Sequence, residues 1–311
     1  MKHFYIFDLL KNLGHKKNFC AILYLILNVA LVCTVFFVLS DGTPTAILVG
    51  CAVYLVAVFV ALSPLGEWIL RLTQGCKKIE DTTVLSRLEP IFFEAVERAQ
   101  AKHPEIPIDP RITLFMKEDP SANAFAVGRR TVCVTSGLLD CSDDEIKGIF
   151  GHELGHLATH DTDLVLLITV GNFLVAGIVT VFRLLILLYK AVFSIFAMFL
   201  GGEDGLLMRI ISGIASLLTL VAVQAVMYVW TKIGIWMVMK TSRDAEYEAD
   251  AFSCDLGYSE GLLSFFGDLL TFEHETVAEG GRIKVFSALA SSHPSAEKRI
   301  ARIYERMGIS S

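Results

Sequence analysis

Four long runs of apolar residues set the basic organisation of the chain. They cover residues 19–40, 46–63, 164–188 and 206–239. A helix needs about 20 apolar residues to cross a bilayer core about 30 Å thick. Each run qualifies as a span, although the second is short, and a re-entrant or tilted segment stays an open alternative for it. The pattern predicts a mostly α-helical integral membrane protein with about four transmembrane helices.

The segments between these runs predict how the helices are oriented. Turn residues at 41–45 join the first two runs into a transmembrane hairpin at 19–63, and residues 164–239 hold spans three and four. Neither the turn at 41–45 nor the loop at 201–205 contains Lys or Arg. Basic residues gather at the opposite ends of the spans: Lys2, Lys11, Lys16, Lys17, Arg71, Lys77, Lys78, Lys240 and Arg243. The positive-inside rule therefore predicts a multi-pass inner-membrane protein with both termini and residues 64–163 in the cytoplasm.

Two further features of the apolar regions have alternative interpretations. Residues 1–18 mix lysines with large apolar side chains, which suits a cytoplasmic segment lying on the membrane surface. A cleaved signal peptide is the rival, but its basic region would be unusually long and a second span follows directly. Arg183 and Lys190 lie about two helical turns apart, and they either reach the bilayer surface or face a polar cavity or lipid headgroups.

Composition supports the membrane assignment. Hydrophobic residues make up 54% of the 311 residues and charged residues only 19%, against about 45–50% and 25% in soluble domains. The net charge of −6 and the lack of a long basic run argue against nucleic-acid binding. The seven cysteines form no C-x-x-C pair, which favours a reducing compartment over a disulfide framework.

The polar segments predict a small α+β domain that is split around spans three and four, in residues 64–163 and 240–311. An amphipathic helix is expected at 85–103, followed by β-like runs at 111–116, 123–128 and 131–135 with a hairpin turn at 128–130. A further helix begins at Ser142, where Ser142 and Glu145 form a capping box.

This capped helix carries the candidate chemistry. His152 and His156 enclose Glu153 in an H-E-x-x-H motif. Residues four apart on a helix differ by about 40° in direction and about 6 Å in rise, so the two imidazoles can bind one zinc ion. Glu153 points about 100° away from His152. It is therefore expected to activate a water molecule as a general base rather than to bind the metal.

A third ligand is expected after the fourth span. Glu246 and Asp250 lie four residues apart on one face of an acidic helix, whereas Glu248 points away. We predict that Glu246 binds the metal and that Asp250 hydrogen-bonds a histidine ligand and orients it. His160 is an unsuitable alternative because it lies about 12 Å from His152 on a continuous helix.

Together these residues resemble the HtpX-type zinc endopeptidases of bacterial membranes, which are relatives of the CAAX prenyl proteases. The similarity covers nearly the whole chain and includes the four spans, the H-E-x-x-H helix, the stretch around Glu246 and Asp250, and the segment 292–300. It implies a gluzincin-type catalytic domain with one zinc ion per chain, and a role in quality control of damaged membrane proteins.

The resemblance also implies roles for residues that their local sequence does not identify. Asn123, Ala124 and Phe125 correspond to the edge strand on which a substrate binds as an added β-strand. His293 corresponds to a residue that stabilises the oxyanion of the tetrahedral intermediate, and Arg299 to an arginine near it, in contact with the substrate.

The sequence thus predicts a zinc-dependent metalloendopeptidase that cleaves misfolded or membrane proteins at the cytoplasmic face of the membrane. A zinc-stabilised membrane scaffold without turnover is the main alternative, although such a site needs no general base. A transporter is the other alternative, but the spans show no inverted repeat. The oligomeric state stays open.

Overall fold

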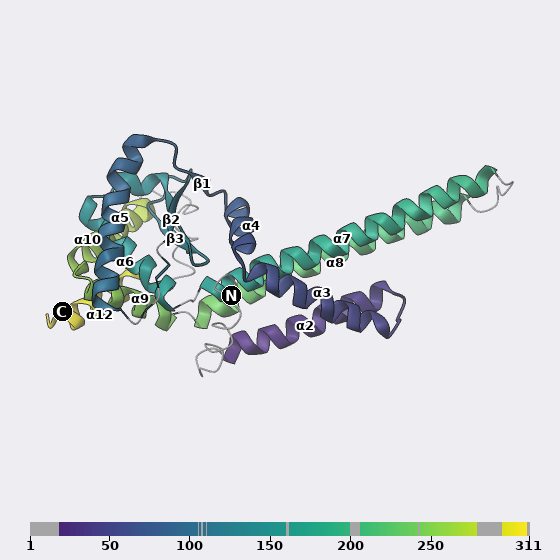
Figure 1. Cartoon of the computed structure of the whole chain (residues 1–311), viewed down its shortest axis with the longest axis horizontal. Helices are drawn as coiled ribbons and strands as arrows, with labels where there is room; N and C mark the ends of the chain where they lie inside the picture. The colour runs from purple at the N-terminus through teal and green to yellow at the C-terminus, as the bar shows by residue number, and fades with distance from the viewer. Residues whose placement is uncertain are drawn as a thin grey trace.

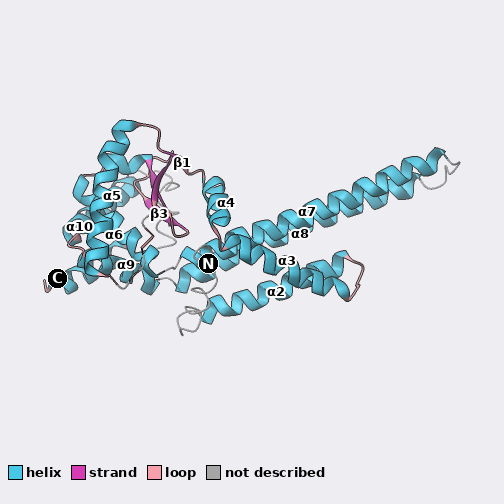
Figure 2. Ribbon diagram, viewed as in Figure 1, coloured by secondary structure: helices cyan, strands magenta, loops and turns pink. Residues whose placement is uncertain are grey.

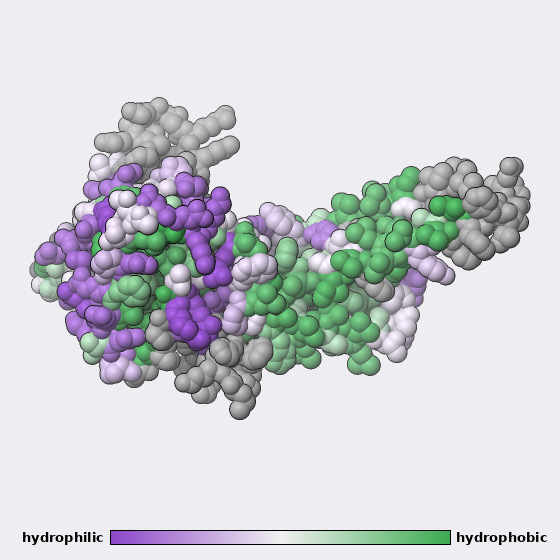
Figure 3. Space-filling view, turned by 45° about the horizontal axis from the view of Figure 1, so that its top comes forward, coloured by the Kyte–Doolittle hydropathy of each residue, from purple (hydrophilic) through white to green (hydrophobic). Residues whose placement is uncertain are grey.

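The computed structural model describes residues 19–104, 106, 108–109, 111–159, 162–199, 206–241, 243–278 and 294–309. It has an elongated shape in which a rounded domain of helices and a small sheet occupies one end (Figure 1). Long helices project from this domain in one direction (Figure 2). The surface of the domain is largely hydrophilic, whereas the projecting helices are largely hydrophobic (Figure 3). This division is the one expected of a membrane protein with a water-exposed domain.

Four helices form the projecting part. Two of them, α2 (Phe19–Leu39) and α3 (Thr45–Ala61), form the predicted hairpin. The other two, α7 (Thr162–Phe199) and α8 (Leu206–Thr241), form a second hairpin that extends well beyond the first (Figure 1). Among the described residues, α2, α7 and α8 are long and apolar enough to cross a membrane on their own. The fourth candidate is a bent pair, in which α3 continues into α4 (Pro64–Gln74) at an angle of 80°.

One helix of the second hairpin, α7, is longer than the sequence pattern suggested, whereas α8 closely follows the long apolar run predicted at 206–239. Helix α7 contains 38 residues and α8 contains 36, whereas about 20 residues suffice for one crossing. The predicted third span ended near residue 188, and the predicted fourth span began at residue 206. The helix continues past 188 because no glycine or proline interrupts residues 189–199.

The domain contains a four-stranded sheet with the order β1–β2–β4–β3. Its strands are β1 (Lys77–Lys78), β2 (Thr113–Lys117), β3 (Ala124–Val127) and β4 (Thr131–Thr135). The pair β2–β4 is parallel, and β3 pairs antiparallel with β4 through the turn that the sequence predicted. Strand β3 therefore forms one edge of the sheet.

Helices cover both faces of this sheet. One face packs against α5 (Thr82–Lys102) and α6 (Asp143–Thr159) in a core that includes Leu114, Val132 and Val134. The other face, which carries Phe115, Val127 and Cys133, packs against α4 and the first turns of α7. The sheet thus separates α6 from the membrane-proximal helices. The domain is completed by α9 (Arg243–Asp255), α10 (Ser259–Ala278) and α12 (Ala296–Met307).

A buried polar network links all four projecting helices. Asn28 of α2 donates to Tyr54 of α3 (3.2 Å) and to Asn172 of α7 (2.8 Å). Asn172 donates in turn to Tyr24 and to Thr231 of α8, both at 2.9 Å. Polar groups in an apolar environment are costly unless they are hydrogen-bonded, so this network requires the four helices to pack in one arrangement.

Some predictions concern residues outside the described part of the chain. These are the surface segment at 1–18, His160 and His293. Arg183 lies half-buried on α7, and the side chain of Lys190 is not among those described.

Candidate metal centre and active site

Helix α6 begins with the predicted capping box. The backbone N–H of Ser142 donates to Glu145 Oε2 (2.8 Å), and the N–H of Glu145 donates back to Ser142 Oγ (3.3 Å). Ser264 of α10 also donates to Glu145, at 2.7 Å, so the cap fixes α6 against a neighbouring helix. The side chains of Ile146, Ile149, Phe150 and Leu154 then bury α6 in the main core. The histidines follow on this fixed helix.

Helix α9 brings the acidic residues to α6. The two helices approach closely because Gly155, inside the H-E-x-x-H motif, has no side chain. A Cβ at this position would lie 2.8 Å from Ala249 Cα and 3.1 Å from Ala249 Cβ. Helices α6 and α9 lie on opposite sides of the α7–α8 hairpin in the sequence, so the fold joins two distant segments here.

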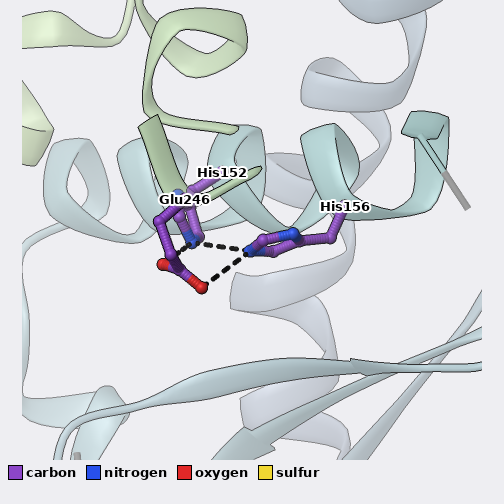
Figure 4. A group of neighbouring side chains, drawn as sticks. All are labelled: His152, His156 and Glu246. Carbon is purple, nitrogen blue, oxygen red and sulfur yellow. Dashed lines mark hydrogen bonds and ion pairs between the residues drawn. The ribbon is translucent and has the colours of Figure 1, made fainter. Parts of the chain in front are cut away.

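Three side chains meet between these helices (Figure 4). The Nε2 atoms of His152 and His156 lie 3.2 Å apart. Glu246 places Oε2 at 3.5 Å from His152 Nε2 and Oε1 at 3.5 Å from His156 Nε2. Two atoms that bind one tetrahedral zinc at about 2.1 Å lie about 3.4 Å apart. These separations are close to that value, and one ligand atom from each of the three residues lies within 4.8 Å of the others, so the residues fit a shared metal ion.

Asp250 and Arg299 lie against this cluster, and the Arg299 guanidinium is 3.6 Å from Glu246 Oε2. Asp250 Oδ1 lies 2.9 Å from His152 Nδ1, on the side of the ring opposite to the metal position. Arg299 of α12 donates to both carboxylate oxygens of Asp250, at 2.8 and 2.5 Å. Burial raises the pKa of the Asp250 carboxyl, but hydrogen bonds from Arg299 and His152 outweigh it and lower this pKa to about 2. Asp250 is therefore ionised and can hold His152 in one orientation.

The side chain of Glu153 extends from α6 to the edge strand β3. Its Oε2 accepts a hydrogen bond from the backbone N–H of Ala126 in β3, at 2.8 Å. In an antiparallel pair, alternate residues direct their backbone groups towards the partner strand and away from it. Thr135 of β4 donates to the carbonyl of Asn123, so the backbone groups of Ala124 and Ala126 are directed away from β4. The free edge of β3 therefore faces Glu153.

A cavity opens beside this edge. Its polar wall includes His152, Glu153, Asn123 and Arg299. Its apolar wall is formed by Ile149, Leu262, Phe265, Phe266 and Leu269. Because His152 lines it, the cavity adjoins the cluster of His152, His156 and Glu246, and among the described residues much of its lining is apolar.

The structure brings most of the predicted site residues to this region. The cavity is lined by Asn123 and Ala124, whereas Phe125 packs on the opposite face of the sheet. The guanidinium of Arg299 lies on Asp250 and against the ring of Phe266. The predicted substrate contact of Arg299 stays a prediction. So does the role of His293, although Pro294, which follows it, lines the cavity.

Sequence reasoning missed two features of the site. One is the pairing of Arg299 with Asp250, because nothing in the local sequence links residues 49 positions apart. The other is the packing role of Gly155, which occupies one of the two variable positions of the H-E-x-x-H motif. A helix glycine beside two metal ligands is the signal that could have revealed the close approach of α9.

Comparisons with known proteins agree with this geometry. The profile of Peptidase family M48 matches residues 86–307. A relative called Protease HtpX from Photorhabdus laumondii is 32% identical over 257 residues, covering 78% of this chain and 80% of its own. Protease HtpX from Hahella chejuensis is 28% identical and covers 83% of this chain and 86% of its own. A Protease HtpX homolog from Salinibacter ruber is 29% identical, with coverage of 72% and 77%.

Proposed function

Because the chain belongs to peptidase family M48 and is a membrane metalloprotease, we propose that it is a zinc-dependent endopeptidase acting at the cytoplasmic face of the membrane. The observation that carries this proposal is the cluster of His152, His156 and Glu246. One ligand atom from each residue lies within 4.8 Å of the others, and Glu153 lies beside the cluster at an open cavity.

The residues of the site divide the chemistry of hydrolysis among them. A zinc ion held by the three ligands would polarise the scissile carbonyl and lower the pKa of water. Glu153 takes one proton from the water molecule while the water oxygen bonds to the carbonyl carbon. It then delivers this proton to the amide nitrogen as the C–N bond breaks, which releases a carboxylic acid and an amine; proton transfer from the acid to the amine leaves a carboxylate and an ammonium group. Asp250 keeps the His152 ring in place throughout.

The edge strand β3 provides the binding site for the substrate backbone. The N–H and C=O groups of Ala124 and the C=O of Ala126 point away from β4, and Ala124 lines the cavity, so an extended substrate can pair with this edge as an added strand. Backbone pairing is independent of side chains, so it suits an enzyme that cleaves many sequences. It also requires an extended substrate, which favours unfolded chains over folded domains.

The cavity beside the metal ligands accepts one substrate side chain. Because Leu262, Phe265 and Phe266 dominate its wall, it favours a large apolar side chain next to the scissile bond. Such side chains are exposed in misfolded and membrane proteins and are buried in folded soluble ones. The basic flanks of the apolar runs support a cytoplasmic location of this site.

The decisive experiment compares wild type with Glu153→Gln in detergent micelles. We expect the variant to bind one zinc ion per chain, as wild type does, and to lose cleavage of an unfolded protein at least about 100-fold, the usual scale for a general base. Glu248→Gln is the matched control, because Glu248 is an exposed acid on α9. Equal cleavage by Glu153→Gln and wild type would assign the activity elsewhere. Zinc binding without cleavage by wild type would favour the scaffold function instead.

A further inference from the structure

Helix α4 has an exposed apolar face that the catalytic function leaves unexplained. Leu65, Trp68 and Leu72 lie on one side of this 11-residue helix and are 51%, 49% and 58% exposed. Their spacing of three and four residues places them in one stripe. The opposite side, with Gly66, Glu67 and Leu70, is buried against the domain. The helix is therefore amphipathic, with one face packed and one face open.

The position of α4 indicates what covers the open face. The helix follows directly from α3 and is bent away from it by 80°. If α3 runs across the bilayer, α4 lies nearly in the plane of the bilayer surface. Along the length of the molecule, α4 lies where the surface changes from hydrophilic to hydrophobic (Figures 1 and 3). The exposed side chains of Val56 and Phe59 continue the apolar surface from α3. Tryptophan is enriched at membrane–water interfaces, so Trp68 suits this position.

The buried face of α4 holds the turn of the edge strand. Glu67 is 2% exposed, and its Oε1 accepts a hydrogen bond from the backbone N–H of Arg129 at 2.7 Å. Gly128, beside Arg129 in the β3–β4 turn, has a φ of +61°. A Cβ at Gly128 would lie only 2.3 Å from Glu67 Cγ, so α4 and the turn fit closely. Arg71 of α4 also donates to Thr131 Oγ1 of β4, at 3.2 Å.

The start of α7 holds the same turn from the other side. The guanidinium of Arg129 makes two hydrogen bonds to the fully buried Asp163, at 3.1 and 2.5 Å. The hydroxyl of Thr162 donates to the Gly128 carbonyl at 2.7 Å. The turn that leads out of β3 is thus fixed to α4 and to a membrane helix. The hydrogen bond from Ala126 to Glu153 lies two residues before this turn.

We propose that α4 is a membrane-interface helix, whose face of Leu65, Trp68 and Leu72 lies among lipid headgroups and acyl chains. Through Glu67, this helix sets the position of the edge strand relative to the bilayer. The proteolytic consequence rests on the proposed function: substrates bind β3 close to the membrane surface, and peptides tethered to the bilayer are favoured. The location of α4 itself is independent of catalysis and can be tested without it.

The location is tested by fluorescence quenching with lipids brominated in the upper part of the acyl chain. The protein is reconstituted in vesicles, and the signal of Trp68 is isolated as the difference between wild type and Trp68→Phe. We expect this signal to fall by roughly half or more, because an interfacial apolar face lies about 5–10 Å into the headgroup boundary. The control is Phe93→Trp in the Trp68→Phe background. Phe93 is 48% exposed on α5, and we expect no quenching there.

Two outcomes would overturn the proposal. Quenching of Trp68 by aqueous iodide but not by brominated lipid would place α4 in water. Quenching by neither reagent, with a signal that changes when the protein is diluted into excess lipid, would show that a second copy covers the face.

The catalytic consequence has a separate test. The double variant Leu65→Gln/Leu72→Gln is compared with Phe93→Gln on one peptide, either free or tethered to the vesicle. We expect about a tenfold loss of kcat/KM on the tethered peptide, which corresponds to about 1.4 kcal/mol, and no change on the free one. Equal losses on both peptides would contradict a role of α4 in presenting the substrate. If wild type cleaves neither peptide, the proposed function fails, while the quenching result still decides where α4 lies.

Discussion

The close contact at Gly155 leads to a sharp prediction about the metal site. In Gly155→Ala, the new Cβ would lie 2.8 Å from Ala249 Cα, whereas an ordinary contact is at least 3.4 Å. Helix α9 must therefore move by about 0.6 Å, because backbone atoms cannot rotate away as a side chain can. Ala249 lies between Glu246 and Asp250, so both carboxylates move with it.

The expected effect on metal binding exceeds the effect on stability. Overpacking costs about 1–3 kcal/mol, but alanine is a better helix former than glycine by about 1 kcal/mol. The two terms partly cancel, which leaves a net loss of about 0–2 kcal/mol in the free energy of unfolding. Displacing a ligand together with its supporting residue costs about 10- to 100-fold in metal affinity. Zinc affinity is therefore the more informative quantity to measure.

The assay is competition for zinc between the protein and a chelating dye in detergent, followed by cleavage of an unfolded protein at saturating zinc. Gly267→Ala in α10 is the matched control, because among the described residues no atom outside its own stretch of helix lies within 4 Å of the added Cβ. We expect the control to keep its zinc affinity and to gain about 0.5–1 kcal/mol of stability. If Gly155→Ala binds zinc as tightly as wild type and cleaves at the same rate, the close approach of α9 does not set the ligand geometry.

Three other perturbations test the supporting structure. Asp250→Asn removes the nearer charged partner of the buried Arg299, whose other ion pair, with Glu246, is longer at 3.6 Å. We therefore expect a loss of about 3 kcal/mol in thermal unfolding and about 10- to 100-fold weaker zinc binding in the dye assay; an unchanged affinity would argue against an orienting role of Asp250. Burial raises the pKa of Glu145, but hydrogen bonds from Ser264 and the start of α6 lower it below its ordinary value of 4.5. Its stabilising effect is therefore present above pH 4.5 and is lost as the pH falls, so the melting curves of wild type and Glu145→Gln should converge in acid; a constant difference would exclude this. Asn172→Leu removes three hydrogen bonds of the membrane network, for which we expect about 2 kcal/mol of lost stability, and wild-type melting in micelles would contradict the importance of the network.

The chemistry on α6 could be predicted from the sequence because it depends on local spacing. The capping box at Ser142 fixes where the helix begins, and the four-residue spacing of His152 and His156 places both rings on one face. The pairing with Glu246 could also be anticipated, since a catalytic zinc needs a third protein ligand. In each case the identity and spacing of the residues determine the geometry with little help from the rest of the fold.

The features that escaped prediction depend on partners far apart in the chain. Asn28 and Asn172 are isolated polar residues in apolar runs, and neither sequence segment shows that the two side chains meet. Helix α4 was assigned to the cytoplasmic segment as a whole, because its apolar stripe spans only 11 residues and the 80° bend after α3 has no signature beyond Ser63 and Pro64.

The division of the metal ligands between α6 and α9 has a consequence for biosynthesis. A nascent chain that has emerged as far as α6 contains His152, His156 and Glu153 but lacks Glu246. The missing carboxylate follows only after the α7–α8 hairpin, whose pairing inside the lipid brings α9 back to α6. A chain that ends before α9 therefore lacks one residue of the cluster. The cluster therefore closes only after both helices of the hairpin have been made, so insertion of the hairpin comes before assembly of the site.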